Sequence, residues 1–309
     1  MLAVLALASL ISGCAQQHST RYKGLAAYPS VVETFASQKV TVVAHRGCWK
    51  DAPENSIAAL RSCIAMGVDM AEIDIRTTAD GSLILMHDGA VGRTTDGEGL
   101  VEQYTLKEIT QLHLRSGKGG RKAPVTDHKV ATLAQALAVS DGALLLNLDI
   151  KQADPAAVFA AVTAAGAERR VLFKSGAPPA DAALVGRPYH GKSAFMPVIK
   201  NCPIGGSQRP CAPNLPDAVA SYGHLVPAAY EIVFDDAAFL QTSGPALAAS
   251  GMELWVNSLY PRISGGRSDA MAIGDPGAVW GSLIEAGASI IQTDEPAALL
   301  AYLARAGLR

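Results

Sequence analysis

From residue 40 onward, short apolar runs alternate with longer stretches of helical character. Such alternation predicts strands separated by helices. The predicted strands cover residues 40–45, 69–75, 82–87, 143–149, 170–174, 193–199, 230–234, 253–257 and 288–292. The predicted helices cover residues 55–66, 132–139, 155–165, 213–221, 237–248, 276–285 and 295–306.

This order of elements indicates an α/β fold with a parallel sheet and helices outside it. A closed sheet of this kind would be a TIM-type (β/α)8 barrel, which takes about 250 residues and fits residues 40–309. Nine strands are predicted where the barrel needs eight, and we expect 193–199 or 230–234 to be the extra one. Residues 89–127, after the third strand, interrupt the repeat with an inserted loop region rich in glycine and charge. Long loops on the catalytic face are usually functional.

The bulk composition is that of a globular protein. The chain has 309 residues, of which 49% are hydrophobic and 17% are charged. Its net charge of −2 gives no reason to expect a nucleic-acid partner or a broadly anionic surface as a partner. Nothing in the sequence indicates an oligomeric state.

The first eleven residues are almost entirely apolar, but the run is too short to span a bilayer, and no Lys or Arg precedes it. The run ends in Ile11-Ser12-Gly13-Cys14, which resembles the lipobox of bacterial lipoproteins, with Cys14 as the acylated residue. We therefore expect residues 1–14 to be a lipoprotein-type signal peptide and residues 15–39 to be a linker. The alternative is an ordinary signal peptide that is cut elsewhere, or a frayed apolar terminus.

The lipobox interpretation places the protein outside the cytoplasm, in the periplasm, with a lipid on Cys14 as its only membrane contact. An oxidising compartment would permit a bridge between Cys202 and Cys211, which bracket a loop rich in glycine and proline. We expect Cys63 to be a buried small hydrophobic residue on a helix, and Cys48 to lie near the site. A zinc site is not expected, because no CxxC or His-x-His spacing occurs.

Polar clusters close the first three predicted strands, as titratable groups do at the catalytic rim of a barrel. His45-Arg46-Gly47 ends the first strand and His87-Asp88 ends the third. Glu72 and Asp74 lie two residues apart in the second strand, so their side chains point to the same face. Two carboxylates on one face repel each other unless a cation lies between them. The pair is therefore a candidate divalent-metal site.

These clusters, in this order, resemble the motifs of the glycerophosphodiester phosphodiesterase family. The early motifs are His45-Arg46-Gly47, Glu54-Asn55-Ser56, Glu72-Ile73-Asp74 and His87-Asp88. The later motifs are Arg93-Thr94-Thr95-Asp96-Gly97, Asp149-Ile150-Lys151, Trp255-Val256-Asn257 and Thr293-Asp294-Glu295-Pro296. The resemblance runs from about residue 40 to the C-terminus.

The resemblance implies metal-dependent hydrolysis of a small-molecule glycerophosphodiester to an alcohol and glycerol phosphate. His45 and His87 would act as general acid and base, because two imidazoles that titrate near neutrality can share these roles. Arg46 would bind the phosphate with its planar fork of donors, and Lys151 would bind it as a point charge. The nucleophile is either water or a neighbouring hydroxyl of the substrate, which would give a cyclic phosphate first.

The implied metal ligands are Glu72 and Asp74, with Asp149 as the third carboxylate. This oxygen-rich set suits Ca²⁺ or Mg²⁺. The family usually has glutamate in place of Asp149, so a shifted cation, an intervening water or another role for Asp149 all stay open. Glu54 is a secondary candidate ligand, although a role with the helix dipole also fits it. Asn55 would lie at the edge of the site.

The pocket's surroundings or far wall would come from Asp88, Glu231, Trp255 and Asn257. Two other functions stay open. One is a lysophospholipase D or sphingomyelinase D-like reaction on a lipid, which an apolar pocket rim from residues 89–127 would support. The other is a lipoprotein that binds phosphodiesters without cleaving them.

Overall fold

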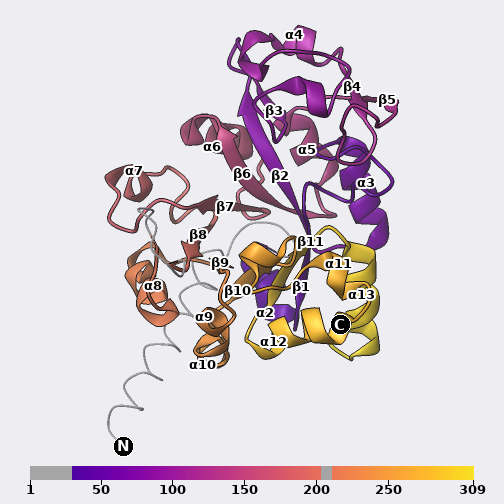
Figure 1. The fold of residues 1–309 in the computed structure, drawn as a ribbon. Helices are drawn as coiled ribbons and strands as arrows, with labels where there is room; N and C mark the ends of the chain where they lie inside the picture. Colours follow the sequence, from indigo (N-terminus) through magenta and orange to yellow (C-terminus); the bar gives the residue numbers. More distant parts are fainter. Residues whose placement is uncertain (1–29, 203–210) are drawn as a thin grey trace, which may run out of the picture.

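The computed structural model describes residues 30–202 and 211–309, and the predicted signal peptide with Cys14 lies outside the described residues. Among the described residues, eight parallel strands form a closed barrel with helices around it (Figure 1). The barrel closes because β1 pairs with the strands on both sides of it, β2 and β11. The strands are β1 (Thr41–Ala44), β2 (Met70–Thr77), β6 (Leu145–Gln152), β7 (Val171–Ser175), β8 (Ala194–Lys200), β9 (Tyr230–Val233), β10 (Leu254–Asn257) and β11 (Ile290–Thr293). The predicted TIM-type fold is confirmed.

Helices surround the barrel, and all of those named next except the C-terminal α13 lie between successive barrel strands (Figure 1). They are α3 (Ile57–Met66), α5 (Leu133–Val139), α6 (Pro155–Ala164), α7 (Ala182–Val185), α8 (Leu215–Ser221), α9 (Ala238–Gln241), α10 (Gly244–Ala249), α11 (Asp269–Ala272), α12 (Ser282–Glu285) and α13 (Pro296–Arg305). Local sequence sets the ends of α3. The hydroxyl of Ser56 accepts from the Ala59 amide at its start, and Gly67 takes a left-handed conformation at its end. Within the described ranges, no helix is long and apolar enough to cross a membrane.

The extra strand is β3 (Leu83–Leu85), so the expectation that it would be 193–199 or 230–234 is wrong. Both of those segments are barrel strands, β8 and β9. Only five residues separate β2 from β3, whereas a parallel connection needs about a dozen or more. β3 therefore returns antiparallel to β2 and lies outside the barrel.

The insertion at residues 89–127 is a folded unit and more than a loop. It contains η1 (Val91–Arg93), η2 (Val101–Gln103), α4 (Leu106–Ile109) and most of a hairpin, β4 (His113–Arg115) with β5 (Val125–Lys129). It has its own apolar cluster, formed by Ile84, Met86, Val91, Val101, Ile109, Leu114 and Val130. Figure 1 shows it beside β3 at one edge of the molecule. Because β3 is not a barrel strand, the insertion lies between the second and third barrel strands.

A helix within the predicted linker packs against the barrel. Residues 15–39 were expected to be a linker, but α2 (Val31–Ser37) forms there, with Ser30 and Glu33 as a capping box. Val31 and Phe35 belong to a buried cluster with the first residues of several barrel strands, such as Met70 and Leu145. The helix therefore covers the amino-terminal end of the barrel, opposite the rim that carries the polar motifs.

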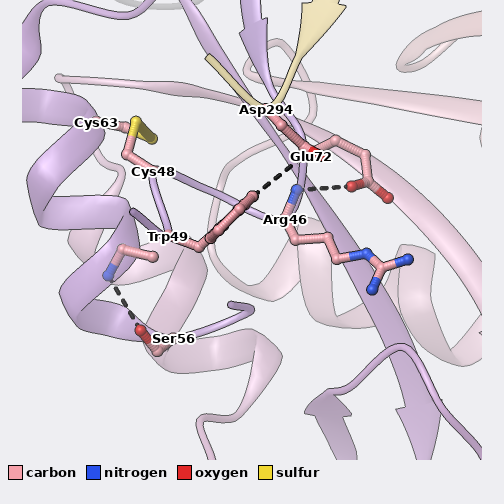
Figure 2. The surroundings of a disulfide bond; sticks show 8 residues. Arg46, Cys48, Trp49, Ser56, Cys63, Glu72 and Asp294 are labelled. Carbon is pink, nitrogen blue, oxygen red and sulfur yellow. Dashed lines mark hydrogen bonds between the residues drawn. A yellow bond between two sulfur atoms is a disulfide. The ribbon is translucent and has the colours of Figure 1, made fainter. Parts of the chain in front are cut away.

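The described residues contain two disulfides. Cys202 and Cys211 are bridged, as an oxidising compartment would permit. Cys48 and Cys63 are also bridged, a pairing that the sequence analysis did not predict. Cys63 is buried as expected, but it is bonded and not a free thiol. The second bridge ties the loop after Arg46 to α3 (Figure 2).

Candidate active site

The turn after β1 brings backbone and side chain of the first motif to the rim. Arg46 and Gly47 both have positive φ, 59° and 77°. A Cβ on Gly47 would lie 3.0 Å from the Ala59 Cβ, so glycine suits both the conformation and the space. The turn directs the Arg46 amide to the Glu72 carboxylate at 2.9 Å (Figure 2). A non-glycine residue at this φ is strained, which is common at functional sites.

His45 is a buried imidazole held by one carboxylate. Its Nδ1 lies 2.8 Å from Asp294 Oδ1, and its Nε2 accepts from Arg46 Nε at 3.2 Å. These partners favour a proton on Nδ1 and a lone pair on Nε2. Burial lowers the pKa of His45, although the hydrogen bond with Asp294 acts in the opposite direction. His45 is thus a neutral base at neutral pH.

Asp294 belongs to the Thr293-Asp294-Glu295-Pro296 motif, but its place in the site was not predicted from the sequence. Its carboxylate also accepts from Trp49 Nε1 at 3.0 Å (Figure 2) and pairs with Lys118 of the insertion. Burial opposes ionisation, but hydrogen bonds from His45 and Lys118 hold the pKa of Asp294 well below its usual value. Its position directly after the last barrel strand was the signal that could have found it.

His87 follows β3 and is the more accessible histidine. Its side chain is 34% exposed, against 9% for His45. Its Nδ1 lies 2.7 Å from Asp88 Oδ1, and its carbonyl accepts from the Arg76 guanidinium at 2.8 and 2.9 Å. Burial opposes ionisation of Asp88, but hydrogen bonds from Arg93 and His87 lower its pKa to about 2. A charged carboxylate therefore orients His87, as Asp294 orients His45.

Glu54 connects the two histidine groups. It accepts from Arg46 Nη1 at 3.1 Å and from Arg93 Nη2 at 2.6 Å, and Arg93 also holds Asp88. Glu54 is only 2% exposed, so it stabilises two guanidinium groups in a region with little water. Its partners among the described residues are cations, whereas the sequence made it a secondary candidate metal ligand.

Glu72, Asp74 and Asp149 come together as predicted. Each offers one carboxylate oxygen, and these three oxygens lie within 4.8 Å of one another. Strand register explains the arrangement, because Asp74 lies opposite Asp149 in the β2–β6 pair. Asn55 fixes Asp74, donating to its carboxylate at 2.7 Å and accepting from its amide at 2.9 Å. Asn55 therefore lies within the site and supports a candidate ligand.

The chemistry of this cluster fits a hard divalent cation. Glu72 and Asp74 are each 1% exposed. Burial raises the pKa of Glu72. The neighbouring Asp74 raises this pKa further, because two adjacent buried negative charges repel each other. Asp74 Oδ1 accepts no hydrogen bond from any described residue, although Lys151 Nζ lies 3.2 Å away. Glu72 forms no salt bridge with any described residue, so a divalent cation would add positive charge beside Glu72 and give Asp74 Oδ1 a partner.

Asp149 contacts two lysines as well as the cluster. Lys151 Nζ lies 2.8 Å and Lys174 Nζ lies 2.9 Å from its Oδ2. Burial opposes ionisation, but Lys174 and Lys151 together hold the pKa of Asp149 far below its usual value. Lys174 was not among the predicted site residues. A lysine at the carboxyl end of a predicted strand, 170–174, was the available signal.

The far side of the site contains Glu231 and Asn257. Asn257 Nδ2 donates to Glu231 Oε1 at 2.7 Å, and Lys174 Nζ lies 3.6 Å from Glu231 Oε2. Trp255 donates to Asn257 Oδ1 at 2.8 Å but belongs to the fully buried cluster with Val31. Trp255 was predicted to lie either in the pocket's surroundings or in its far wall, and it occupies the first position, because it supports Asn257 from the buried core.

Comparison with protein families gives two matches. Residues 45–175, which carry most of the site, match the glycerophosphoryl diester phosphodiesterase family. Residues 206–303 match a domain of unknown function. The glycerophosphodiester phosphodiesterase of Caldanaerobacter subterraneus subsp. tengcongensis is 40% identical over 114 residues, which are 37% of this chain and 46% of that protein. The chain thus matches slightly less than half the length of this relative.

Solved structures of similar proteins cover nearly the whole barrel. A glycerophosphoryl diester phosphodiesterase from Parabacteroides distasonis has a TM-score of 0.71 at 20% identity, with 90% of this chain and 93% of that chain covered. An Oleispira antarctica phosphodiesterase, solved with its product sn-glycerol-3-phosphate, has a TM-score of 0.61 at 22% identity, with 85% and 96% covered. The fold is shared with these proteins, and the matched residues 45–175 carry most of the motifs, so the predicted resemblance to the glycerophosphodiester phosphodiesterase family is confirmed.

Proposed function

We propose that the protein hydrolyses small-molecule glycerophosphodiesters, releasing an alcohol and glycerol phosphate, with the help of a divalent cation. One observation carries the proposal: three carboxylates, Glu72, Asp74 and Asp149, converge beside two cationic groups at the rim that also holds His45. The match of residues 45–175 to the glycerophosphoryl diester phosphodiesterase family supports the reaction class. The product in the Oleispira antarctica phosphodiesterase, sn-glycerol-3-phosphate, supports the same product here.

The phosphate would bind between cations of the chain. Arg46 Nε and Lys151 Nζ lie 3.6 and 3.2 Å from different oxygens of Asp74, so both groups border the carboxylate cluster. Arginine can donate two parallel hydrogen bonds to phosphate oxygens, and lysine adds a compact charge. Glu72, Asp74 and Asp149 would hold Ca²⁺ or Mg²⁺, which when bound supplies further neutralisation of negative charge.

The two histidines would move the protons. His45 Nε2 carries the lone pair, so it would take the proton of the attacking hydroxyl once Arg46 turns to the phosphate. His87 has its Nδ1 on Asp88, which leaves Nε2 to give a proton to the departing alkoxide. The attacking oxygen belongs either to water or to a neighbouring hydroxyl of the substrate, and both routes use the same two histidines.

A location outside the cytoplasm is part of this proposal. Two disulfides support it, because such bonds persist mainly in oxidising compartments. The proposed anchor, Cys14, lies outside the described residues. The insertion contributes Lys118 and Arg93 to the site, both charged, which favours a polar glycerophosphodiester over a lipid phosphodiester.

A panel of substrates tests the function. The purified protein is incubated with glycerophosphodiesters and with lysolipids, with and without a chelator, while released alcohol and glycerol phosphate are measured. We expect glycerol phosphate to be released from glycerophosphodiesters. We expect no release in the presence of the chelator, and renewed release after Ca²⁺ or Mg²⁺ is added. Cleavage of lysolipids alone would favour the lipid reaction. Failure to cleave any of these compounds in the presence of either cation would refute the proposal.

A further inference from the structure

A hollow of about 520 Å³ opens beside the carboxylate cluster, at the carboxyl ends of β6 to β9. Asp149 belongs to both, so the hollow directly adjoins the proposed reaction site. Its other polar lining includes Lys174, Arg187, Lys200 and Glu231. Of these residues, only Asp149 belongs to the motifs that resemble the family.

Positive charge in this hollow exceeds negative charge. Asp149 and Glu231 are its two carboxylates, and Lys174 pairs with both, at 2.9 and 3.6 Å. Arg187 and Lys200 form no salt bridge with any residue in the described ranges. The hollow therefore presents two cations whose charge is not balanced by a neighbouring acid.

Arg187 is also incompletely hydrogen-bonded. Its Nε is buried and has no hydrogen-bond partner among the described residues. A buried donor without an acceptor is unfavourable, and such groups are rare unless a ligand or water satisfies them. The neighbouring Tyr189 is 2% exposed and its ring stacks on Phe173 at 4.3 Å between centroids, so this segment is packed against the barrel. The backbone that carries Arg187 is thus fixed beside the hollow.

We propose that this hollow is an anion subsite, formed chiefly by Arg187 and Lys200, and that the substrate carries a second anionic group besides its phosphodiester. The inference rests on the proposed function and names its substrate class. A guanidinium donates two hydrogen bonds to the oxygens of either a phosphate or a carboxylate, and an ammonium adds charge to either. The favoured substrates are glycerophosphodiesters whose alcohol carries one of these groups.

Two matched pairs of substrates test the subsite. Glycerophosphoserine differs from glycerophosphoethanolamine by a carboxylate, and glycerophosphoinositol 4-phosphate differs from glycerophosphoinositol by a phosphate. The wild type should prefer the more anionic member of at least one pair by about tenfold in kcat/KM, which is about 1.4 kcal/mol. The preference should decline as salt is added, because ions screen partly exposed charges.

Substitution of the subsite residues should remove the preference and keep the reaction. Arg187→Gln should lower kcat/KM for the more anionic member by about tenfold and leave its partner unchanged. Lys200→Gln, at an exposed side chain, should lower the same preference without affecting folding. Arg305→Gln on α13 is the matched control, since Arg305 is exposed and does not line the hollow.

Equal kcat/KM for both members of both pairs in the wild type would overturn the subsite. Equal losses for both members in Arg187→Gln and Lys200→Gln would also overturn it, because the residues would then serve the reaction in general. If no substrate is cleaved, the proposed function fails, and calorimetry decides the subsite. Tighter binding of the more anionic member, lost in Arg187→Gln, would support the subsite alone, while equal affinities would refute it.

Discussion

The two sides of the barrel rim differ in how their charged side chains are paired. On the side of β1, β2 and the insertion, Arg46 and Arg93 both contact the buried Glu54, and each histidine has its own carboxylate. On the side of β7 and β8, Arg187 and Lys200 have no acidic partner within the described part of the chain. Paired charges fix geometry, which acid–base chemistry requires.

The unbalanced cations of the second side do little to fix geometry, but they remain available to a ligand. The difference suggests a division of tasks across one rim. The first side would carry out the proposed reaction, and the second would select among substrates. Changes on the first side should therefore affect all substrates alike, whereas changes at Arg187 should affect only some.

The largest effect is expected from the histidines. His45→Ala and His87→Ala should each lower kcat by about 10²-fold or more for every substrate, the usual scale of general acid–base catalysis. KM should change much less, because Arg46 and Lys151 still bind the phosphate. His128→Ala on β5 is the control, since His128 is exposed. Wild-type rates in both histidine variants would contradict the assigned roles.

A pH profile of activity tests the role of His45 as a general base. Burial lowers the pKa of His45 below its ordinary value of 6.5, and the imidazole acts as a base only when neutral. The acid limb of kcat/KM should therefore lie below pH 6.5. Asp294→Asn removes a negative charge that raises the pKa of His45, so this limb should move to still lower pH.

The same variant should lower kcat by about 10- to 100-fold, the scale for partners that orient a reactive group. Glu295→Gln serves as its neighbour control, because Glu295 pairs with Lys50 and does not contact His45. A lower rate with an unmoved acid limb would mean that Asp294 only supports the loop.

Local sequence predicted most of the barrel and its first side, because both depend on residues close together in the chain. Strand alternation placed Glu72 beside Asp74, and the strand ends placed His45 and His87. The assignment of β3 failed because hydrophobicity alone does not give strand direction. The five-residue gap after β2 is too short for a parallel connection and therefore indicates an antiparallel strand.

The second side could not be predicted in the same way. Arg187 lies after the short helix α7, and its place in the hollow depends on the packing of Tyr189 on Phe173. The Cys48–Cys63 bridge likewise required α3 to bring the two Cα atoms to 5.2 Å. Lys174 was visible as a charged strand end, but its partners Asp149 and Glu231 come from other strands.

The central claim, that Glu72, Asp74 and Asp149 hold a cation needed for the reaction, is tested most directly by a metal titration of activity. The chelator-treated wild type should be inactive and should recover as Ca²⁺ or Mg²⁺ is added. Asp149→Asn should need more metal for half-activation, and high metal should rescue part of its rate. Asp149→Glu restores the residue usual in the family and should be tolerated if the pocket has room, while Asp127→Asn, at an exposed aspartate of β5, is the control.

If Asp149→Asn needs the same metal concentration for half-activation as the wild type, Asp149 positions Lys151 and Lys174, and only Glu72 and Asp74 are metal ligands. Full activity of the wild type in excess chelator would contradict the claim itself.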